Sequence, residues 1–173
     1  MPGTVTSERV DGALAGIEHR WLAHRDGLPA LELDLAGLAP ALRALKERAG
    51  FESATFVTAV DRLPRVPRFE LVHQLFSLAH NERVRLHTPL AEKENAPSCT
   101  ELWPGAAYME RECYDMFGIR FEGHVGLKRL LMPEEFEHHP LRKDFPHQGI
   151  EPDRLYREWD KKRRAEWHPE AAR

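Results

Sequence analysis

Glutamates and histidines gather in one short stretch of this sequence, where residues 134–139 hold three glutamates and two histidines. Imidazole and carboxylate groups are common ligands of transition metals, so the stretch is a candidate metal site. Adjacent histidines, however, point in different directions, and the sequence contains neither HExxH nor His-x-His spacing. We therefore favour a solvated or interface loop. The alternative is a free metal-dependent enzyme that uses His124, His138 and His139.

The sequence offers no catalytic nucleophile and no phosphate-binding loop. It lacks the GxGxxG, GxxxxGK[ST] and GxSxG motifs that cradle phosphates or present a catalytic serine. Two cysteines, Cys99 and Cys113, are too few for a disulfide framework or a four-thiolate metal site, and we expect both to be buried as small apolar side chains. Acidic and basic residues are interspersed at a net charge of −3, which disfavours nucleic-acid binding. These absences favour a scaffold or interaction subunit.

Glu110 is a candidate of another kind, because it interrupts an apolar row with helical spacing. A carboxylate on an apolar face costs several kcal/mol unless it is paired. We favour a structural ion pair with a distant arginine, and the alternatives are a catalytic carboxylate or a contact with another subunit. On the polar side we expect Arg111, Glu112 and Asp115, with Arg111 and Asp115 paired at i,i+4.

The elements that would position these residues form an α+β pattern. Length and 42% hydrophobic residues suit one domain with a real core. We expect a two-layer domain with a mixed, largely antiparallel sheet of about five strands, in the order α-β-β-α-β-β-β-α. The ranges are a helix from Ser7, a hairpin over 18–35 turning at Asp26-Gly27, a helix from Pro40 to Gly50, strands at 51–60, 68–78 and 83–90, a capping box at Ser98–Glu101, and a helix from about 104 to Phe117 ended by Gly118.

Prolines punctuate the chain beyond this pattern. They recur every six or seven residues at Pro133, Pro140, Pro146 and Pro152, between large apolar side chains. A segment of this kind either wraps its own domain or lies along a partner. We predict an α+β domain over residues 1–121 and an extended segment over 122–173 that wraps partner subunits, with a short helix or a frayed end over 153–173. We expect no membrane span and no signal peptide.

Residues 110–146 carry a family resemblance. The segments are Glu110-Arg111-Glu112, Tyr114–Ile119, Gly123-His124, Leu127–Pro133 and Pro140–Pro146. Together they resemble the signature of the 30-kDa-type (C) subunit of NADH:quinone oxidoreductase, respiratory complex I. The resemblance is very specific over about 45 residues and looser over residues 10–100.

This resemblance implies a non-catalytic structural and assembly subunit of a peripheral arm, on the cytoplasmic side of the inner membrane. It implies that the chain binds no cofactor, and that FMN and iron–sulfur clusters sit on partner subunits. The implied partners are the 49-kDa-type (D) subunit, chiefly, and subunits B and I. The equivalent subunit of a membrane-bound hydrogenase or of another quinone-reducing complex is an alternative.

The resemblance also implies a partner interface made by the C-terminal segment. Apolar anchors would be Leu130, Leu131, Phe136, Leu141 and Phe145. Arg142, Lys143 and Asp144 would form charge-assisted pairs that fix the register of the segment on the partner. Glu110 or Arg111 would be available to pair with the partner. The other signature positions are Glu112, Asp115, Gly118, His124, Arg129, Pro133 and Pro140.

Overall fold

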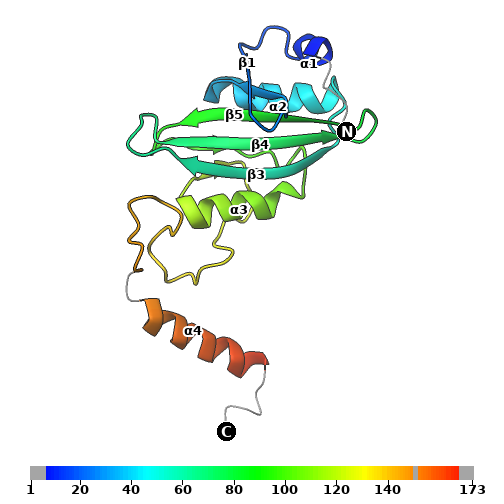
Figure 1. The fold of residues 1–173 in the computed structure, drawn as a ribbon. Helices are drawn as coiled ribbons and strands as arrows, with labels where there is room; N and C mark the ends of the chain where they lie inside the picture. The colour runs from blue at the N-terminus through cyan, green and yellow to red at the C-terminus, as the bar shows by residue number, and fades with distance from the viewer. Residues whose placement is uncertain (1–6, 150–151, 168–173) are drawn as a thin grey trace.

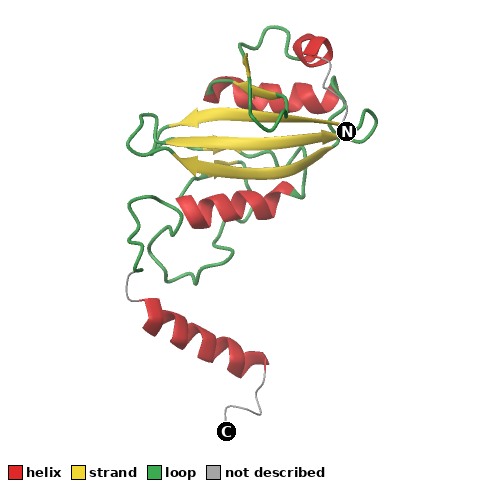
Figure 2. Ribbon diagram, in the orientation of Figure 1, coloured by secondary structure: helices red, strands yellow, loops and turns green. Residues whose placement is uncertain are grey.

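The computed structural model describes residues 7–149 and 152–167 (Figure 1). Its centre is a five-stranded sheet in the order β1-β2-β5-β4-β3 (Figure 2). The strands are β1 Arg20–Leu22, β2 Ala30–Glu32, β3 Ser53–Asp61, β4 Phe69–Ser77 and β5 Glu82–Leu90. Only the β2–β5 pair is parallel within this sheet, so the predicted mixed, largely antiparallel sheet is confirmed.

Helices α2 (Leu35–Glu47) and α3 (Ala106–Phe117) pack on the sheet beside β5 and β3, respectively (Figure 1). Alternating residues of β3, β4 and β5 point into the same core as both helices, which makes the predicted two-layer arrangement. Across the three long strands Val57, His73 and Leu86 pair in register and are all buried. The remaining elements are α1 Ser7–Ala13, β6 Ala96–Pro97, β7 Phe121–Glu122 and α4 Pro152–Trp167.

The predicted hairpin over residues 18–35 is confirmed as β1 and β2. Gly27 adopts a positive φ of 70° in the connecting turn, and Asp26 accepts the Leu28 N–H on its side chain at 3.1 Å. Both features match the turn chemistry that Asp-Gly favours.

Helix α2 begins five residues before the predicted start at Pro40, so that boundary was wrong. The side chain of Asp34 accepts the Gly37 N–H at 2.7 Å and caps the helix there, which places Pro40 inside the first turns. Leu38, Leu42 and Leu45 form the apolar row of the helix and are all buried.

The capping box predicted at Ser98–Glu101 was also wrong. Glu101 is exposed and pairs with Arg43, while the Ser98 hydroxyl donates to Glu110. Helix α3 itself starts at Ala106 and ends at Phe117, and Gly118 follows in the left-handed conformation with a φ of 77°, as predicted.

Residues 123–149, which we call the strap, contain neither helix nor strand. The strap runs below α3 in Figure 1 and leads to α4. Of the two states considered for residues 153–173, the structure has the helix, and residues 168–173 lie outside the described part. The pairs of Asp160 with Arg163 and Arg164 support α4 at i,i+3 and i,i+4 spacing. No helix within the described ranges is long and apolar enough to cross a membrane.

Candidate functional site

Asp115, in the last turns of α3, holds the strap. Its Oδ2 accepts three successive backbone N–H groups, from Leu130 at 3.0 Å, Leu131 at 2.6 Å and Met132 at 2.8 Å. Its Oδ1 accepts a bond from Arg129 at 2.7 Å. Successive amides that converge in this way form a concave anion site, which this chain fills with its own carboxylate.

Asp115 is fully buried, so its predicted place on the polar side of the helix and its predicted pair with Arg111 were wrong. Burial opposes its ionisation. The Met132 amide, the Arg129 guanidinium and the amides of Leu131 and Leu130 outweigh that effect and keep the pKa of Asp115 below its usual value. The carboxylate is therefore charged at neutral pH.

Arg111 complements Asp115 by donating hydrogen bonds to backbone carbonyl groups of the same loop. It donates to the carbonyls of Lys128 at 3.2 Å and Arg129 at 2.8 Å. One acid and one base on adjacent turns of α3 therefore hold the N–H and C=O groups of a single strap segment. The guanidinium is used within the chain, which does not support the implied pairing of Arg111 with a partner.

Glu110 is fully buried under the turn that precedes α3. It accepts the Ser98 hydroxyl at 2.7 Å and the Cys99 N–H at 2.7 Å. The favoured ion pair with a distant arginine was wrong, because no cation pairs with Glu110 among the residues that the structure describes. Neutral donors satisfy the carboxylate instead, and they tie the 98–100 turn to α3.

The strap also occupies the C-terminal end of α3, where helix carbonyls lack intrahelical partners. Leu141 donates its N–H to the Met116 carbonyl at 3.1 Å, and Arg142 Nε donates to the Phe117 carbonyl at 2.6 Å. His139 Nδ1 donates to the Asp115 carbonyl at 2.9 Å. Burial lowers the pKa of His139, so a neutral ring makes this bond at neutral pH.

Gly118 makes this approach possible. A Cβ atom at this position would lie 2.6 Å from both Arg142 Nη2 and His139 Nε2. The position also has a positive φ, which glycine adopts at no steric cost. Gly118 therefore ends the helix and leaves room for the strap.

An ionic cluster fastens the far part of the strap to the sheet. Arg68, which precedes β4, pairs with Asp61 at 2.8 Å, Asp144 at 2.7 Å and Glu92 at 2.9 Å. Glu92 also accepts from Arg142 at 3.0 Å. We call these five residues the Arg68 cluster. It joins the ends of β3 and β4 to the loop after β5 and to the strap.

Asp61 is the buried acid of the Arg68 cluster. Burial opposes its ionisation, but the Arg68 guanidinium and the amides of Leu63 and Lys143 lower the pKa of Asp61 to about 2. The Lys143 N–H lies 2.9 Å from Asp61 Oδ2, and Lys143 Nζ donates to the Leu63 carbonyl at 3.1 Å.

Residues 142–144 were expected to pair with a partner subunit, and that stays a prediction. Each of them pairs within this chain, with α3 or with the ends of β3 and β4. They do fix the register of the strap, but on its own domain. Asp61, Arg68 and Glu92 were missed by the sequence analysis. The sequence did contain a signal for this pair. Asp61 directly follows the predicted strand at 51–60, and Arg68 begins the predicted strand at 68–78, so a hairpin brings the two residues together.

The predicted apolar anchors divide into two groups. Phe136 is 4% exposed, with Phe145 at a ring distance of 6.3 Å and the Arg129 guanidinium 5.8 Å from its ring, so it packs inside this chain. Leu131 and Leu141 are 58% and 53% exposed. Among the other signature residues, Leu130, Phe145 and Pro140 are half-buried, Pro133 is buried and Glu112 is exposed.

The histidines and cysteines make packing contacts. His124 Nε2 donates to the Ala107 carbonyl at 3.1 Å. The His138 ring packs against Phe136 at 5.8 Å. Cys99 and Cys113 are buried as predicted, and burial raises the pKa of both thiols. Over residues 7–149 and 152–167, no group of three or more His, Cys, Asp or Glu residues is placed to hold a metal ion.

The sequence matches the family described as "Respiratory-chain NADH dehydrogenase, 30 Kd subunit" over residues 31–151. The C subunit of the NADH-quinone oxidoreductase of Rhodopseudomonas palustris is 40% identical over 147 residues, which are 83% of this chain and 71% of that protein. The C subunit of Roseiflexus castenholzii is 57% identical over 88 residues, which are 50% of this chain and 51% of that protein. The chain thus spans about half the length of the Roseiflexus relative.

One relative is a much longer protein, and one solved structure has a similar fold. The second C/D-type subunit of the NADH-quinone oxidoreductase of Aquifex aeolicus is 47% identical over 113 residues, which are 65% of this chain but 19% of that protein. A chain of the membrane-bound sulfane sulfur reductase, an archaeal respiratory membrane complex, has a similar fold with a TM-score of 0.68. It is 23% identical, and the alignment covers 89% of this chain and 91% of that one.

Proposed function

The chain belongs to the family of 30-kDa subunits of respiratory-chain NADH dehydrogenase, and on this premise we propose that it is a structural and assembly subunit of a proton-translocating NADH:quinone oxidoreductase. It would contribute no catalysis itself and would hold the quinone-end subunits of the peripheral arm in register. The observation that carries the proposal is the strap, which is bonded along α3 and leaves Leu131 and Leu141 exposed.

A strap ordered by its own domain suits an assembly role. Asp115, Arg111 and Gly118 fix its backbone before any partner is present, so less conformational entropy is lost on docking. Exposed leucines on a fixed backbone provide apolar anchors of the kind that dominate binding energy.

We propose the 49-kDa-type (D) subunit as the chief partner, with subunits B and I nearby. The Aquifex relative carries C and D in its name as one protein, and this chain covers 19% of it, which supports close association of the two. FMN and iron–sulfur clusters would be held by other subunits. The complex would place this chain on the cytoplasmic side of the inner membrane as a peripheral subunit.

The test is affinity purification of the tagged chain from its own cells, followed by mass spectrometry. We expect the double variant Leu131→Asp/Leu141→Asp to lose the 49-kDa-type subunit, because two charges would replace exposed apolar anchors. Leu78→Asp is the matched control, since Leu78 is 69% exposed in the turn between β4 and β5. Equal recovery of the 49-kDa-type subunit with the double variant and the control would contradict the proposal.

Point variants are a sharper test than removal of residues 122–173. Truncation after residue 121 would also take away the donors of the buried Asp115 carboxylate. Loss of assembly would then report a damaged domain as well as a missing contact.

A second candidate is the equivalent subunit of a complex fed by another electron donor. The fold shared with the sulfane sulfur reductase chain supports keeping it, because this fold also occurs in a respiratory membrane complex of another name. The subunits that co-purify distinguish the two. A flavin- and NADH-binding subunit is expected for the oxidoreductase, and its absence from an intact complex would favour the second candidate.

A further inference from the structure

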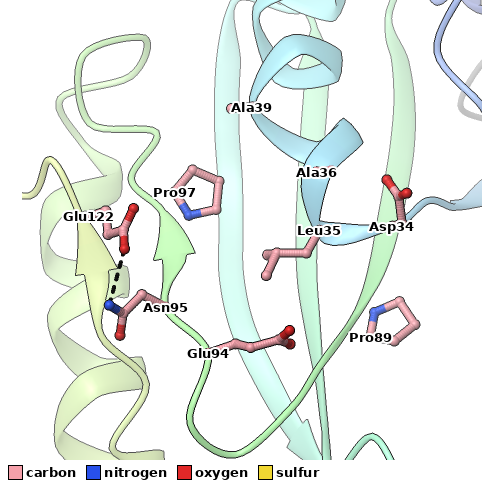
Figure 3. A pocket seen from close by; sticks show the side chains of 9 residues that line it. All are labelled: Asp34, Leu35, Ala36, Ala39, Pro89, Glu94, Asn95, Pro97 and Glu122. Carbon is pink, nitrogen blue, oxygen red and sulfur yellow. Dashed lines mark hydrogen bonds between the residues drawn. The ribbon is translucent and has the colours of Figure 1, made fainter.

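A groove lies away from the strap, between the first turns of α2 and strand β6. Its volume is about 650 Å³. Figure 3 shows the side chains that line it. The apolar walls come from three elements: Leu35 and Ala39 of α2, Pro97 of β6, and Pro89 at the end of β5. Ala36 and Ala39 are small and exposed, so a second backbone can approach α2 closely here. Pro97 has no N–H, which leaves apolar surface at this position of β6.

Three carboxylates rim this apolar groove, from Asp34, Glu94 and Glu122. Each accepts a neutral donor: Gly37 N–H at 2.7 Å for Asp34, Ala91 N–H at 2.8 Å for Glu94, and the Asn95 side-chain amide at 3.1 Å for Glu122. None of the three pairs with a cation among the described residues, and no lysine or arginine lines the groove. The acids of the Arg68 cluster, by contrast, are all paired with arginine.

A neighbouring hollow of about 370 Å³ continues the acidic surface. It shares Asp34 and Pro89 with the groove and adds Glu18 and Glu32. His19 and Arg20 also line it, and Arg20 pairs with Glu32 at 2.6 Å, which leaves Glu18 and Asp34 without a cation among the described residues. Apolar walls with an uncompensated negative rim complement a segment that carries lysine or arginine beside small apolar side chains. A second copy of this chain fits less well, because its formal net charge of −3 would oppose association at an acidic surface.

We propose that this groove receives a basic, partly apolar segment of a neighbouring protein subunit. This would be a second contact surface, distinct from the strap. The inference rests on the proposed function, since it requires that the chain be part of a multisubunit complex. With contacts at two separate surfaces, the chain would bind two neighbouring subunits at once.

The test is a competition for incorporation into the complex. A tagged Glu94→Lys/Glu122→Lys variant is co-expressed with the untagged chain, and mass spectrometry gives the ratio of the two in the purified complex. We expect this ratio to fall about tenfold, because two favourable rim pairs become repulsive. Glu94→Gln/Glu122→Gln should fall by less. Asp34 is left unchanged because it caps α2.

Glu8→Lys/Glu47→Lys is the matched control, with the same charge change on exposed residues of α1 and α2 outside the groove. All variants are first compared by thermal melting, so that a folding defect is not read as weak binding. A ratio for the groove variant equal to that of the control would overturn the inference while leaving the proposed function intact. If neither the control nor the unmodified chain enters a complex, the proposed function itself fails.

A carbodiimide cross-link provides a second readout on the unmodified complex. This reagent joins a carboxylate to a lysine amine in direct contact. A link from Glu94 or Glu122 to a lysine of a different subunit supports the inference and identifies the segment. Links only to a second copy of this chain would overturn it.

Discussion

The long strands and the strap are stabilised by opposite kinds of contact. Strands β3, β4 and β5 bury leucine, valine and phenylalanine against α2 and α3, and cross-strand pairs extend over nine residues. The strap buries Phe136 and Pro133 and packs Leu127 and Met132 against the core, and it is held mainly by hydrogen bonds and ion pairs to α3 and to the Arg68 cluster. Apolar burial tolerates changes of pH and salt, whereas this polar attachment depends on specific charges. The comparison can be tested by removing one polar contact at a time.

The largest effect is expected for Asp115→Asn. It removes a buried charge and replaces one accepting oxygen by an NH₂ group that cannot accept, so some of the three amides and the guanidinium lose their partner. We expect a loss of about 3–5 kcal/mol in unfolding free energy, measured by urea denaturation. Hydrogen exchange should also lose protection at Leu130 and Met132. Glu112→Gln, on the exposed side of the same helix, should change stability by less than about 0.5 kcal/mol. Protection of the strap amides in the Asn variant would argue against their dependence on this carboxylate.

The core has its own polar exception in His73. Both ring nitrogens are buried without a hydrogen-bond partner, and burial lowers the pKa of His73 to about 4. As the pH falls from about 6.5 to 4, His73 therefore takes up a proton in the unfolded chain but stays neutral in the folded chain. The free energy of unfolding does not depend on the titration of His73 above about pH 6.5, and it falls by about 3 kcal/mol on acidification to pH 4.

His73→Leu tests that linkage. The leucine variant should be more stable than the parent at pH 4.5, and its stability should change less between pH 7 and pH 4.5. Urea denaturation at the two pH values provides the measurement, with the exposed His80→Gln as control. An unchanged pH dependence would show that another group controls the acid sensitivity of the core.

A smaller effect is expected for Gly118→Ala, which combines a positive φ with the close approach of Arg142 and His139. The cost should be about 1–3 kcal/mol. Limited proteolysis should show faster cleavage in the strap, while amides of β4 keep their protection. Equal protection of strap and strands would mean that the strap tolerates displacement from the helix end. Gly126→Ala has a positive φ but open space around it, and it separates backbone strain from the clash.

The smallest effect is expected for Asp144→Asn. Its side chain is half exposed, so its pair with Arg68 should contribute only about 0.5 kcal/mol. Arg68 still has Asp61 and Glu92 in the variant. We expect a slight loss of stability that shrinks with added salt. A loss as large as that of Asp115→Asn would mean that the Arg68 cluster, and not α3, is the main attachment of the strap.

The sequence predicted the regular elements better than their polar partners. Strands at residues 51–90 follow from alternation and turn residues, and the end of α3 follows from Gly118, because these signals are local. Glu110 and Asp115 were misassigned for a physical reason. A helical period tells which side of α3 is apolar, but a polar residue can be buried by a loop that brings its own N–H groups, as residues 130–132 do for Asp115.

The Arg68 cluster lay beyond sequence reasoning for a different reason. Arg68 and Asp144 are separated by 76 residues, and no periodicity links a strand end to a loop. The family resemblance groups residues 142–144 and implies partners for them in another subunit. Only the three-dimensional arrangement shows that they bind their own domain.

The spacing of the strap's contacts along the chain has a consequence for the order of folding. Asp115 meets Arg129 and Met132 across 14 and 17 residues, and Arg142 meets Phe117 across 25. The bond between Asp61 and Lys143 spans 82 residues. Loop closure is cheaper for the shorter spans, so the helix-bound contacts can form as soon as residues 106–142 are available. The bonds to Asp61 and Arg68 close a longer loop and form only after residues 142–144 are available, onto the hairpin of β3 and β4. In a chain emerging from the ribosome, β3 and β4 come before the strap, so Asp61 and Arg68 are already available when residues 142–144 appear, and the strap closes last onto a preformed hairpin.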